Sequence, residues 1–305
     1  MVDSIVVMAD PPGHWENQPT GFVQPAVWGS VVSVGRKATP PWETGRRDTF
    51  RVRFGEDPEA YDRTRPVAPD SVFDDIVRLA RLHAESTVVE IGPGTGQATR
   101  PLAERGLRVL ALEIDPRLAA RAAQNLAGLA HVSVSATSFE AWDPSDARFD
   151  AVFACNSFHW IDPDTRFAKV VEVLEPHGHL VLVSTPVVVP ENASRFWWDV
   201  QDDWAAVGAD YVDPATKHPD LVEDLRSAVR ASGLFEDPTV TRHRFDVSLT
   251  AEEYVANLST QSGVKELPPE AQAGLLERIE RRVDAHGGTL TVHHVAVVTV
   301  TRRAE

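Results

Sequence analysis

The stretch Val88-Val89-Glu90-Ile91-Gly92-Pro93-Gly94-Thr95-Gly96 decides the fold of this chain. A short apolar run that contains one carboxylate leads into three glycines at alternate positions, and a helix-like segment follows. Glycine accepts positive φ and lets a ligand approach the main chain closely. The first amides of the next helix have no partner within that helix, so they point at whatever is bound there. The sequence therefore predicts a strand, a tight turn that holds a ligand, and a helix.

The spacing of the glycines separates two kinds of nucleotide site. A dinucleotide fingerprint reads G-x-G-x-x-G, whereas this chain has E-x-G-x-G-x-G, so that Gly96 comes one residue early. A second carboxylate, Glu113, ends the apolar run at 107–112. One helix and one strand fit between Gly96 and Glu113, which places this carboxylate where it can accept hydrogen bonds from ribose hydroxyls. Together the two signals predict a βαβ unit that binds a ribose-containing cofactor.

Residues 86–185 resemble the core of a class I S-adenosylmethionine-dependent methyltransferase. The run FDAVFA at 149–154 is similar to the fourth strand of that fold, and LEPHGHLVLV at 174–183 resembles its LxPGGxLxL turn and fifth strand. The dipeptide His159-Trp160 and the segment AYDRTRP at 60–66 are similar to the branch related to trans-aconitate methyltransferases and actinobacterial small-molecule methyltransferases. The resemblance implies S-adenosyl-L-methionine as cofactor and methyl transfer to a small-molecule acceptor, by in-line displacement at the sulfonium methyl.

Strands and helices alternate along most of the chain. Strands are predicted at 87–91, 108–112, 131–135, 149–154 and 179–185, with helices at 97–105, 116–127 and 164–174. Such alternation argues for a parallel sheet covered on both faces. Two further strands, at 238–248 and 289–302, form an antiparallel C-terminal hairpin by resemblance. We therefore expect an α/β, three-layer, Rossmann-like methyltransferase fold with a mostly parallel seven-stranded sheet and a small helical cap.

Composition divides the chain into two parts. Residues 1–50 are rich in proline and show no sustained hydrophobic period, which predicts an irregular or disordered N-terminal extension. Residues 51–305 are predicted to form the methyltransferase domain, in which 186–237 interrupt the alternation as a cap insert. In that insert Trp197, Val200, Trp204 and Val207 recur at helical spacing. This stripe either packs on the core or belongs to a lid that lines the acceptor pocket.

The residues predicted to bind the cofactor begin with the glycine loop, Gly92, Gly94 and Gly96. Glu113 is the predicted ribose ligand, with Asp115 or plain solvation of the carboxylate as the alternatives. The resemblance implies that Glu90 contacts the methionine amino group of the cofactor; the alternative is an ordinary charge at the end of a strand.

Five more residues complete the predicted cofactor site. Ser138 stands where the family commonly has an aspartate that reads the adenine amino group, so that contact is expected to be weaker, water-mediated or made by main chain. Phe139 is expected to pack on the adenine ring, and Asn156 follows the fourth strand. Tyr61 and Arg65 could reach the cofactor carboxylate or an acidic acceptor.

His159 is the candidate catalytic residue. It follows the fourth strand at its carboxyl end, where open α/β sheets place ligands, and an imidazole can accept a proton near neutral pH. A structural histidine bonded beneath the cap is the competing interpretation. A base is needed only if the acceptor is a hydroxyl, because a carboxylate or thiolate acceptor is already nucleophilic. The neighbouring Trp160 is expected to shape the pocket.

Charge and residue usage exclude other classes of function. The chain has 30 Lys and Arg against 45 Asp and Glu, a net charge of −15, which disfavours nucleic acid and anionic membranes as partners. A single cysteine, Cys155, fits a cytoplasmic protein. No metal-binding pattern is visible, since His293 and His294 would point to opposite faces of a strand. Two alternatives remain: a cofactor-binding protein with a non-methylating or regulatory role, and a nicotinamide-dependent oxidoreductase, which the glycine spacing argues against.

Overall fold

The predicted βαβ unit is present in the computed structural model, which describes residues 51–208 and 212–305. Strand β1 (Thr87–Ile91) leads through the glycine turn into helix α4 (Thr99–Glu104), and β2 (Arg108–Glu113) returns parallel to β1. Helix α4 begins two residues later than predicted. Pro101 is thus its third residue, where the missing amide hydrogen has no partner in a helix. The N-terminal extension predicted for 1–50 lies outside the described residues.

The remaining elements follow the predicted alternation closely. The other strands are β3 (Val132–Ala136), β4 (Phe149–Cys155), β5 (Leu174–Ser184), β6 (Val187–Val188), β7 (Thr239–Thr250) and β8 (Thr289–Arg302). The other α-helices are α2 (Pro58–Thr64), α3 (Asp70–Leu79), α5 (Pro116–Asn125), α6 (Arg166–Val173), α7 (Phe196–Asp199), α8 (Gln201–Ala205), α9 (Arg226–Ser232), α10 (Ala251–Ser259), α11 (Ser262–Lys265) and α12 (Pro269–Ala285). Short 3-10 helices are η2 (Val52–Glu56), η3 (Phe158–Trp160), η4 (Pro214–Lys217) and η5 (Pro219–Leu221).

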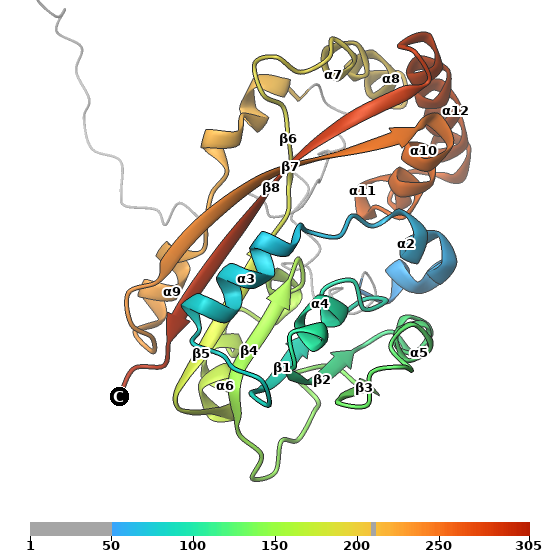
Figure 1. Cartoon of the computed structure of the whole chain (residues 1–305). Coiled ribbons are helices and arrows are strands. Elements are labelled where there is room, and N and C mark those ends of the chain that lie inside the picture. Colours follow the sequence, from blue (N-terminus) through green and yellow to red (C-terminus); the bar gives the residue numbers. More distant parts are fainter. Residues whose placement is uncertain (1–50, 209–211) are drawn as a thin grey trace, which may run out of the picture.

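The strands form one sheet in the order β3-β2-β1-β4-β5-β8-β6, and β7 pairs with β8. Strands β1 to β5 are parallel, whereas β8 runs antiparallel to β5, β6 and β7 (Figure 1). This confirms the Rossmann-like fold and its antiparallel C-terminal hairpin. The sheet has eight strands rather than the predicted seven, because the two-residue strand β6 pairs with β8 just beyond β5.

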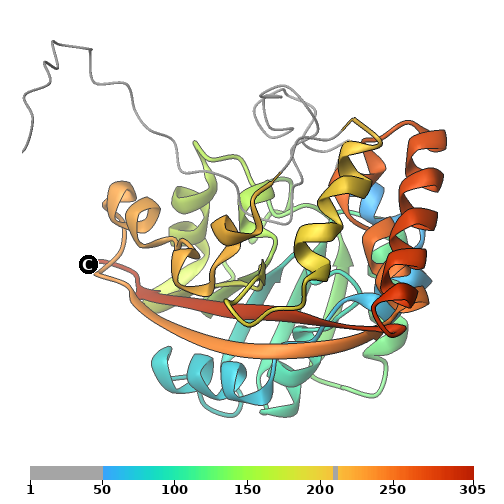
Figure 2. The ribbon, with the colours of Figure 1, turned by 90° about the horizontal axis from the view of Figure 1, so that it is seen from above.

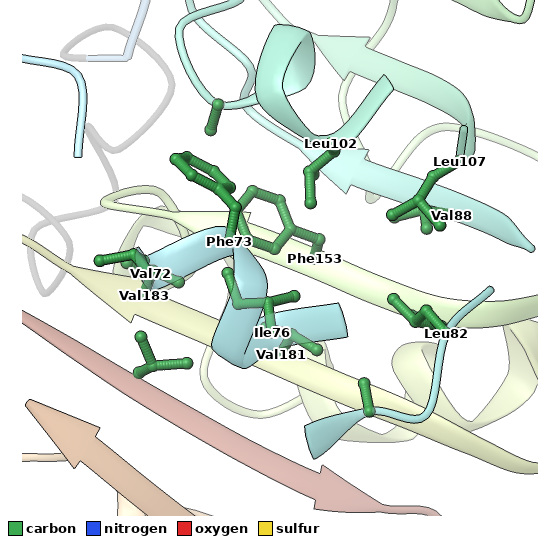
Figure 3. Packing of buried hydrophobic residues seen from close by; sticks show 14 of the residues in the cluster. Val72, Phe73, Ile76, Leu82, Val88, Leu102, Leu107, Phe153, Val181 and Val183 are labelled. Atoms are coloured by element: carbon green, nitrogen blue, oxygen red, sulfur yellow. The ribbon is translucent and has the colours of Figure 1, made fainter. Parts of the chain in front are cut away.

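Alternate residues along each strand pack into two separate hydrophobic clusters. Val88, Phe153 and Val181 point to one face of the sheet, where they meet α3 and α4 (Figure 3). Val89, Val152 and Leu180 point to the other face, where they meet α6 and α9. Figure 2 shows α3 and α9 on opposite sides of the long strands β7 and β8. This alternation is the period of two that any strand buried on both faces must follow, and it makes the three layers.

A third hydrophobic cluster, the cap cluster, lies at one end of β7 and β8, where α10, α11 and α12 gather beside α7 and α8 (Figure 1). The predicted stripe contributes Trp197, Val200 and Trp204, which are buried against the long helix α12 and against Tyr254 of α10. The cap is therefore built from two distant stretches of the chain. Helix α9, which the sequence also places in 186–237, packs on the main sheet through Val229.

The start of helix α3 is defined by a proline. The first helical residue is Asp70, and the N-cap residue is Pro69, which has no side-chain hydrogen bond. The extended backbone of Pro69 ends the preceding segment without a capping side chain. None of the helices between 51 and 208 or between 212 and 305 has the length and apolar character needed to cross a membrane.

Candidate functional site

The glycine loop is shaped so that only glycine fits at its centre. Gly92, Gly94 and Gly96 all have positive φ, of 64°, 62° and 98°. A Cβ atom on Gly94 would lie 3.0 Å from Cε1 and 3.2 Å from the hydroxyl oxygen of Tyr61. Backbone of this conformation strains any residue that has a Cβ. The loop therefore presents bare main chain directly beneath the Tyr61 ring.

Glu113 closes the glycine loop from the tip of β2. Its Oε2 accepts a 3.0 Å hydrogen bond from the Gly94 amide, and its Oε1 accepts one of 3.0 Å from the Asp115 amide. The side chain is only 4% exposed, and this burial raises the pKa of Glu113 to about 7. Each carboxylate oxygen keeps a second lone pair, so both remain able to accept from a ligand hydroxyl.

Glu90 is the last residue but one of β1, and it is 1% exposed. Within the described chain its Oε2 atom is buried without a hydrogen-bond partner. Burial, together with the nearby Glu113 carboxylate, raises the pKa of Glu90 to about 7. Buried oxygens are rarely left unpaired in native proteins, because each costs about 1–3 kcal/mol. A buried carboxylate with one unpaired oxygen beside a glycine loop suits a ligand cation.

Tyr61 and Arg65, both from the α2 segment, form one wall of the loop. The Arg65 guanidinium lies 4.7 Å from the centroid of the Tyr61 ring, and its Nη2 donates to the carbonyl of Thr260 at 3.2 Å. Phe54 of η2 packs edge-on against both Tyr61 and Trp160, with centroids 6.4 Å and 5.7 Å away. The aromatic wall thus joins the N-terminal segment to the residues that follow β4.

The two residues predicted near the adenine, Phe139 and Ser138, lie in the turn after β3. Phe139 is 1% exposed and belongs to the hydrophobic cluster of one sheet face, where the Lys169 ammonium lies 5.5 Å from its ring centroid. Its ring therefore packs within the protein. The Ser138 hydroxyl accepts from the Ala141 amide at 3.1 Å and shapes the turn after β3. The Phe139 ring is thus committed to the local fold, whereas the Ser138 hydroxyl keeps its own hydrogen to donate.

Asn156 stands at the end of β4 with a positive φ of 53°. Its Nδ2 donates to Thr185 Oγ1 at 2.7 Å, and its Oδ1 accepts from the Thr185 amide at 2.9 Å. Both side-chain groups thus tie the carboxyl ends of β4 and β5 together. The next residue, Ser157, would meet a Cβ on Gly92 at 2.8 Å. The predicted cofactor residue Asn156 therefore holds the wall of the site.

His159 lies on η3, with its ring 5.2 Å from that of Trp160. Burial and the Arg166 guanidinium lower the pKa of His159 to about 4. The imidazole is therefore neutral at physiological pH, and its conjugate acid is far more acidic than the pKa near 7 that suits a general base. His159 is also absent from the residues that line the cavity described next.

A cavity of about 70 Å³ lies between the cap and the end of the sheet. Its lining is mostly apolar and includes the three tryptophan and valine positions of the predicted stripe, Trp197, Val200 and Trp204. The stripe packs in the cap cluster, as the first interpretation expected, and the same residues line this cavity. Their part in an acceptor pocket stays a prediction. The polar lining residues are Thr64, Gln201, Lys217, Tyr254, Asn257, Gln261 and His294. Sequence reasoning proposed none of these seven for a site.

Two chains of contacts connect the cavity to the glycine loop. On one side, Thr64 lines the cavity and follows Tyr61 on α2, while Asn257 Nδ2 donates to the Thr64 carbonyl at 2.8 Å. On the other side, the His294 ring nitrogen Nδ1 lies 3.2 Å from the carbonyl oxygen of Thr185, the partner of Asn156. The loop and the cavity therefore share walls at the same edge of the sheet.

The histidine pair on β8 is divided between two faces, as the alternation of a strand requires. His293 Nδ1 lies 2.7 Å from Asp246 Oδ1 near the surface, whereas His294 is buried and stacks on Phe245 with a centroid distance of 5.1 Å. In the described ranges, 51–208 and 212–305, no cluster of three or more His, Cys, Asp or Glu residues is arranged to hold a metal ion.

Comparisons with known proteins agree with this architecture. Residues 88–178 match the family model described as a methyltransferase domain. An uncharacterized methyltransferase of Mycobacterium tuberculosis is 28% identical over 262 residues, which are 84% of this chain and 95% of that protein. The protein-L-isoaspartate O-methyltransferase of Gloeobacter violaceus is 30% identical over 169 residues, which are 54% of this chain and 77% of that protein.

A solved structure shows the same fold. The protein assigned as a type II methyltransferase from Anaeromyxobacter dehalogenans superposes with a TM-score of 0.54 at 18% identity, covering 78% of this chain and 97% of that one. The branch indicated by His159-Trp160 and by residues 60–66 stays a prediction. From its β1 glycine loop, its strand order and these relatives, the chain is a class I S-adenosylmethionine-dependent methyltransferase, with S-adenosyl-L-methionine as its cofactor.

Proposed function

We propose that this enzyme transfers the methyl group of S-adenosylmethionine to a small-molecule acceptor that binds in the cavity between the cap and the sheet. The observation that carries the proposal is the shared wall: α2 contacts the glycine loop through Tyr61 and lines the cavity through Thr64. Ligands of open α/β sheets bind beyond the carboxyl ends of the strands. A cavity at that edge, with a mostly apolar lining, suits a small organic acceptor.

The residues around the loop fit the cofactor chemically. We place its methionine ammonium against the orphaned Oε2 of Glu90, because a cation is the group that satisfies a buried unpaired carboxylate. Glu113 accepts from the ribose hydroxyls with its remaining lone pairs, while its bonds to Gly94 and Asp115 keep it in place. Tyr61 covers the main chain of the loop, and Arg65 stays on the wall shared with the cavity.

The protein contributes to the reaction by aligning the acceptor with the methyl group of the cofactor and by excluding water. The bound sulfonium supplies an activated methyl group, and holding an acceptor in line with it can contribute roughly 7–11 kcal/mol. The lowered pKa of His159 argues against its predicted role as general base. We therefore propose that His159 and Trp160 support the wall, and that the acceptor is nucleophilic without deprotonation by this imidazole.

The type of acceptor is tested by following a labelled methyl group. Purified enzyme is incubated with S-adenosylmethionine labelled on the methyl group and with a bacterial extract, separated by filtration into metabolites and macromolecules. We expect label in the metabolite fraction and S-adenosylhomocysteine in equal amount. The net charge of −15 supports this expectation, because it disfavours nucleic acid as the acceptor. Label found only in protein or RNA would overturn the proposal.

A further inference from the structure

Most polar groups that line the cavity are committed to bonds within the protein. Asn257 donates to the Thr64 carbonyl and accepts from Gln261 Nε2 at 3.0 Å. Gln201 donates to the Trp197 carbonyl at 3.3 Å and accepts from the Val212 amide at 3.2 Å. These pairs complete the frame of the cavity, so they are poor candidates for recognising a ligand.

Three lining residues keep a hydrogen-bond donor that no described group satisfies. The Trp197 indole Nε1 is buried without a partner. The Tyr254 hydroxyl and the Lys217 ammonium likewise have no hydrogen bond or ion pair to any residue in 51–208 or 212–305. Trp197, Tyr254 and Lys217 come from α7, α10 and η4, and each lines the same cavity.

The described lining of the cavity includes one lysine and no acidic residue. Lys217 therefore has no counter-ion among the described residues that line the cavity. Lys217 is half-buried, and withdrawing an ammonium from water without a partner is costly. Burial lowers the pKa of Lys217 from its ordinary value, as expected for an ammonium without a partner. A bound anion would supply a counter-ion and stabilise the protonated form of Lys217.

We propose that the acceptor, bound at the site proposed above, is an amphipathic acid with one anionic group that pairs with Lys217 and an apolar body that contacts Trp197, Trp204 and Val200. Every unsatisfied group is a donor or can act as one, and an anion is the ligand group that accepts from all of them. The apolar walls favour a single charged group over several, since each additional charge would be desolvated without a partner. Lys217 is thus a residue that determines specificity.

The inference is tested by comparing the binding of acids with that of their neutral amides. Phenylacetate and hexanoate are titrated against phenylacetamide and hexanamide in the presence of S-adenosylhomocysteine, with calorimetry and tryptophan fluorescence as readouts. We expect each acid to bind about tenfold or more tightly than its amide. Lys217→Gln should remove this preference and Lys217→Arg should retain part of it. Arg148→Gln, which removes one charge from an exposed loop residue, should leave the preference intact.

Stability separates loss of recognition from loss of folding. Since Lys217 is half-buried and has no ion pair with any residue in 51–208 or 212–305, Lys217→Gln should keep or raise the Tm in the absence of ligand, so a lost acid preference in that variant reflects binding. Equal binding of acids and amides, including no binding of either, would overturn the inference. If labelled methyl reaches a neutral metabolite and Lys217→Gln leaves that turnover unchanged, this inference is wrong while the proposed small-molecule methylation stands.

Discussion

Replacing Gly94 with valine is expected to lower the affinity for S-adenosylmethionine at least a hundredfold. Gly94 has a φ of +62°, in which a β-branched side chain is strained by about 1–3 kcal/mol. The new Cβ would also stand 3.0 Å from the Tyr61 ring, which would have to shift to make room. Both the conformation of the loop and its bare surface are lost, while the strands beneath are untouched. Calorimetric titration with S-adenosylmethionine and S-adenosylhomocysteine measures the effect.

The matched control for this substitution is Gly128→Val. Gly128 follows α5, and a Cβ there would meet nothing within 4 Å. This variant should bind both ligands as the wild type does. Circular dichroism of Gly94→Val should show native secondary structure, because the change is confined to a turn. Wild-type affinity in a folded Gly94→Val protein would exclude the glycine loop as the cofactor site.

The affinity for S-adenosylmethionine is expected to rise about tenfold between pH 6 and pH 7.5. Burial raises the pKa of Glu90 to about 7, so most free enzyme carries a protonated Glu90 at pH 6. The cationic cofactor requires the carboxylate form, and at low pH binding must first remove this proton. Glu90→Gln should weaken binding at pH 7.5 and reduce the dependence on pH, while Glu113, whose pKa is also about 7, still titrates in the variant. Calorimetry in buffers of different ionisation enthalpy should show less proton release from the variant than from the wild type.

The raised pKa of Glu90 also makes the stability of the cofactor-free protein depend on pH. The pKa of Glu90 in the folded state, about 7, is above its ordinary value of 4.5. Between pH 4.5 and pH 7 the folded state binds a proton that the unfolded state has lost. The stabilisation that this proton gives the folded state is therefore full below pH 4.5 and disappears as the pH rises through 7. Glu90→Gln should reduce the fall in free energy of unfolding between pH 5 and pH 8. If Glu90→Gln changes neither the pH dependence of the free energy of unfolding nor the pH dependence of the affinity for S-adenosylmethionine, the assignment of Glu90 is contradicted.

The fold was predictable because its signals are local. The glycine spacing after β1, the carboxylate at the end of β2 and the alternating strands each lie within a short stretch of sequence, and each follows from backbone geometry. The position of Glu113 was predicted for the same reason, since the end of a strand fixes where a side chain emerges. The role of Glu90 was implied by the family resemblance and stays a prediction. The short strand β6 was missed because two valines carry no period of their own.

The cavity was not predictable because no single stretch of sequence builds it. Thr64, Lys217, Tyr254 and His294 lie far apart along the chain and meet only when the cap folds over β7 and β8. Lys217 looks like any surface lysine in the sequence, and its unusual surroundings come entirely from residues brought in by other elements. The burial of Phe139 was not predictable for a related reason: an aromatic residue after a strand can face the core or the ligand, and tertiary packing decides which.

The most direct test of the account is the crystal structure of the enzyme with S-adenosylhomocysteine. The shared wall predicts that the adenosyl group lies by Glu113, the homocysteine ammonium contacts Glu90 Oε2, and the sulfur faces the cavity lined by Trp197 and Lys217. A complex in which the sulfur points away from this cavity, with main chain separating the two, would contradict the claim that the glycine loop and the cavity form one active site.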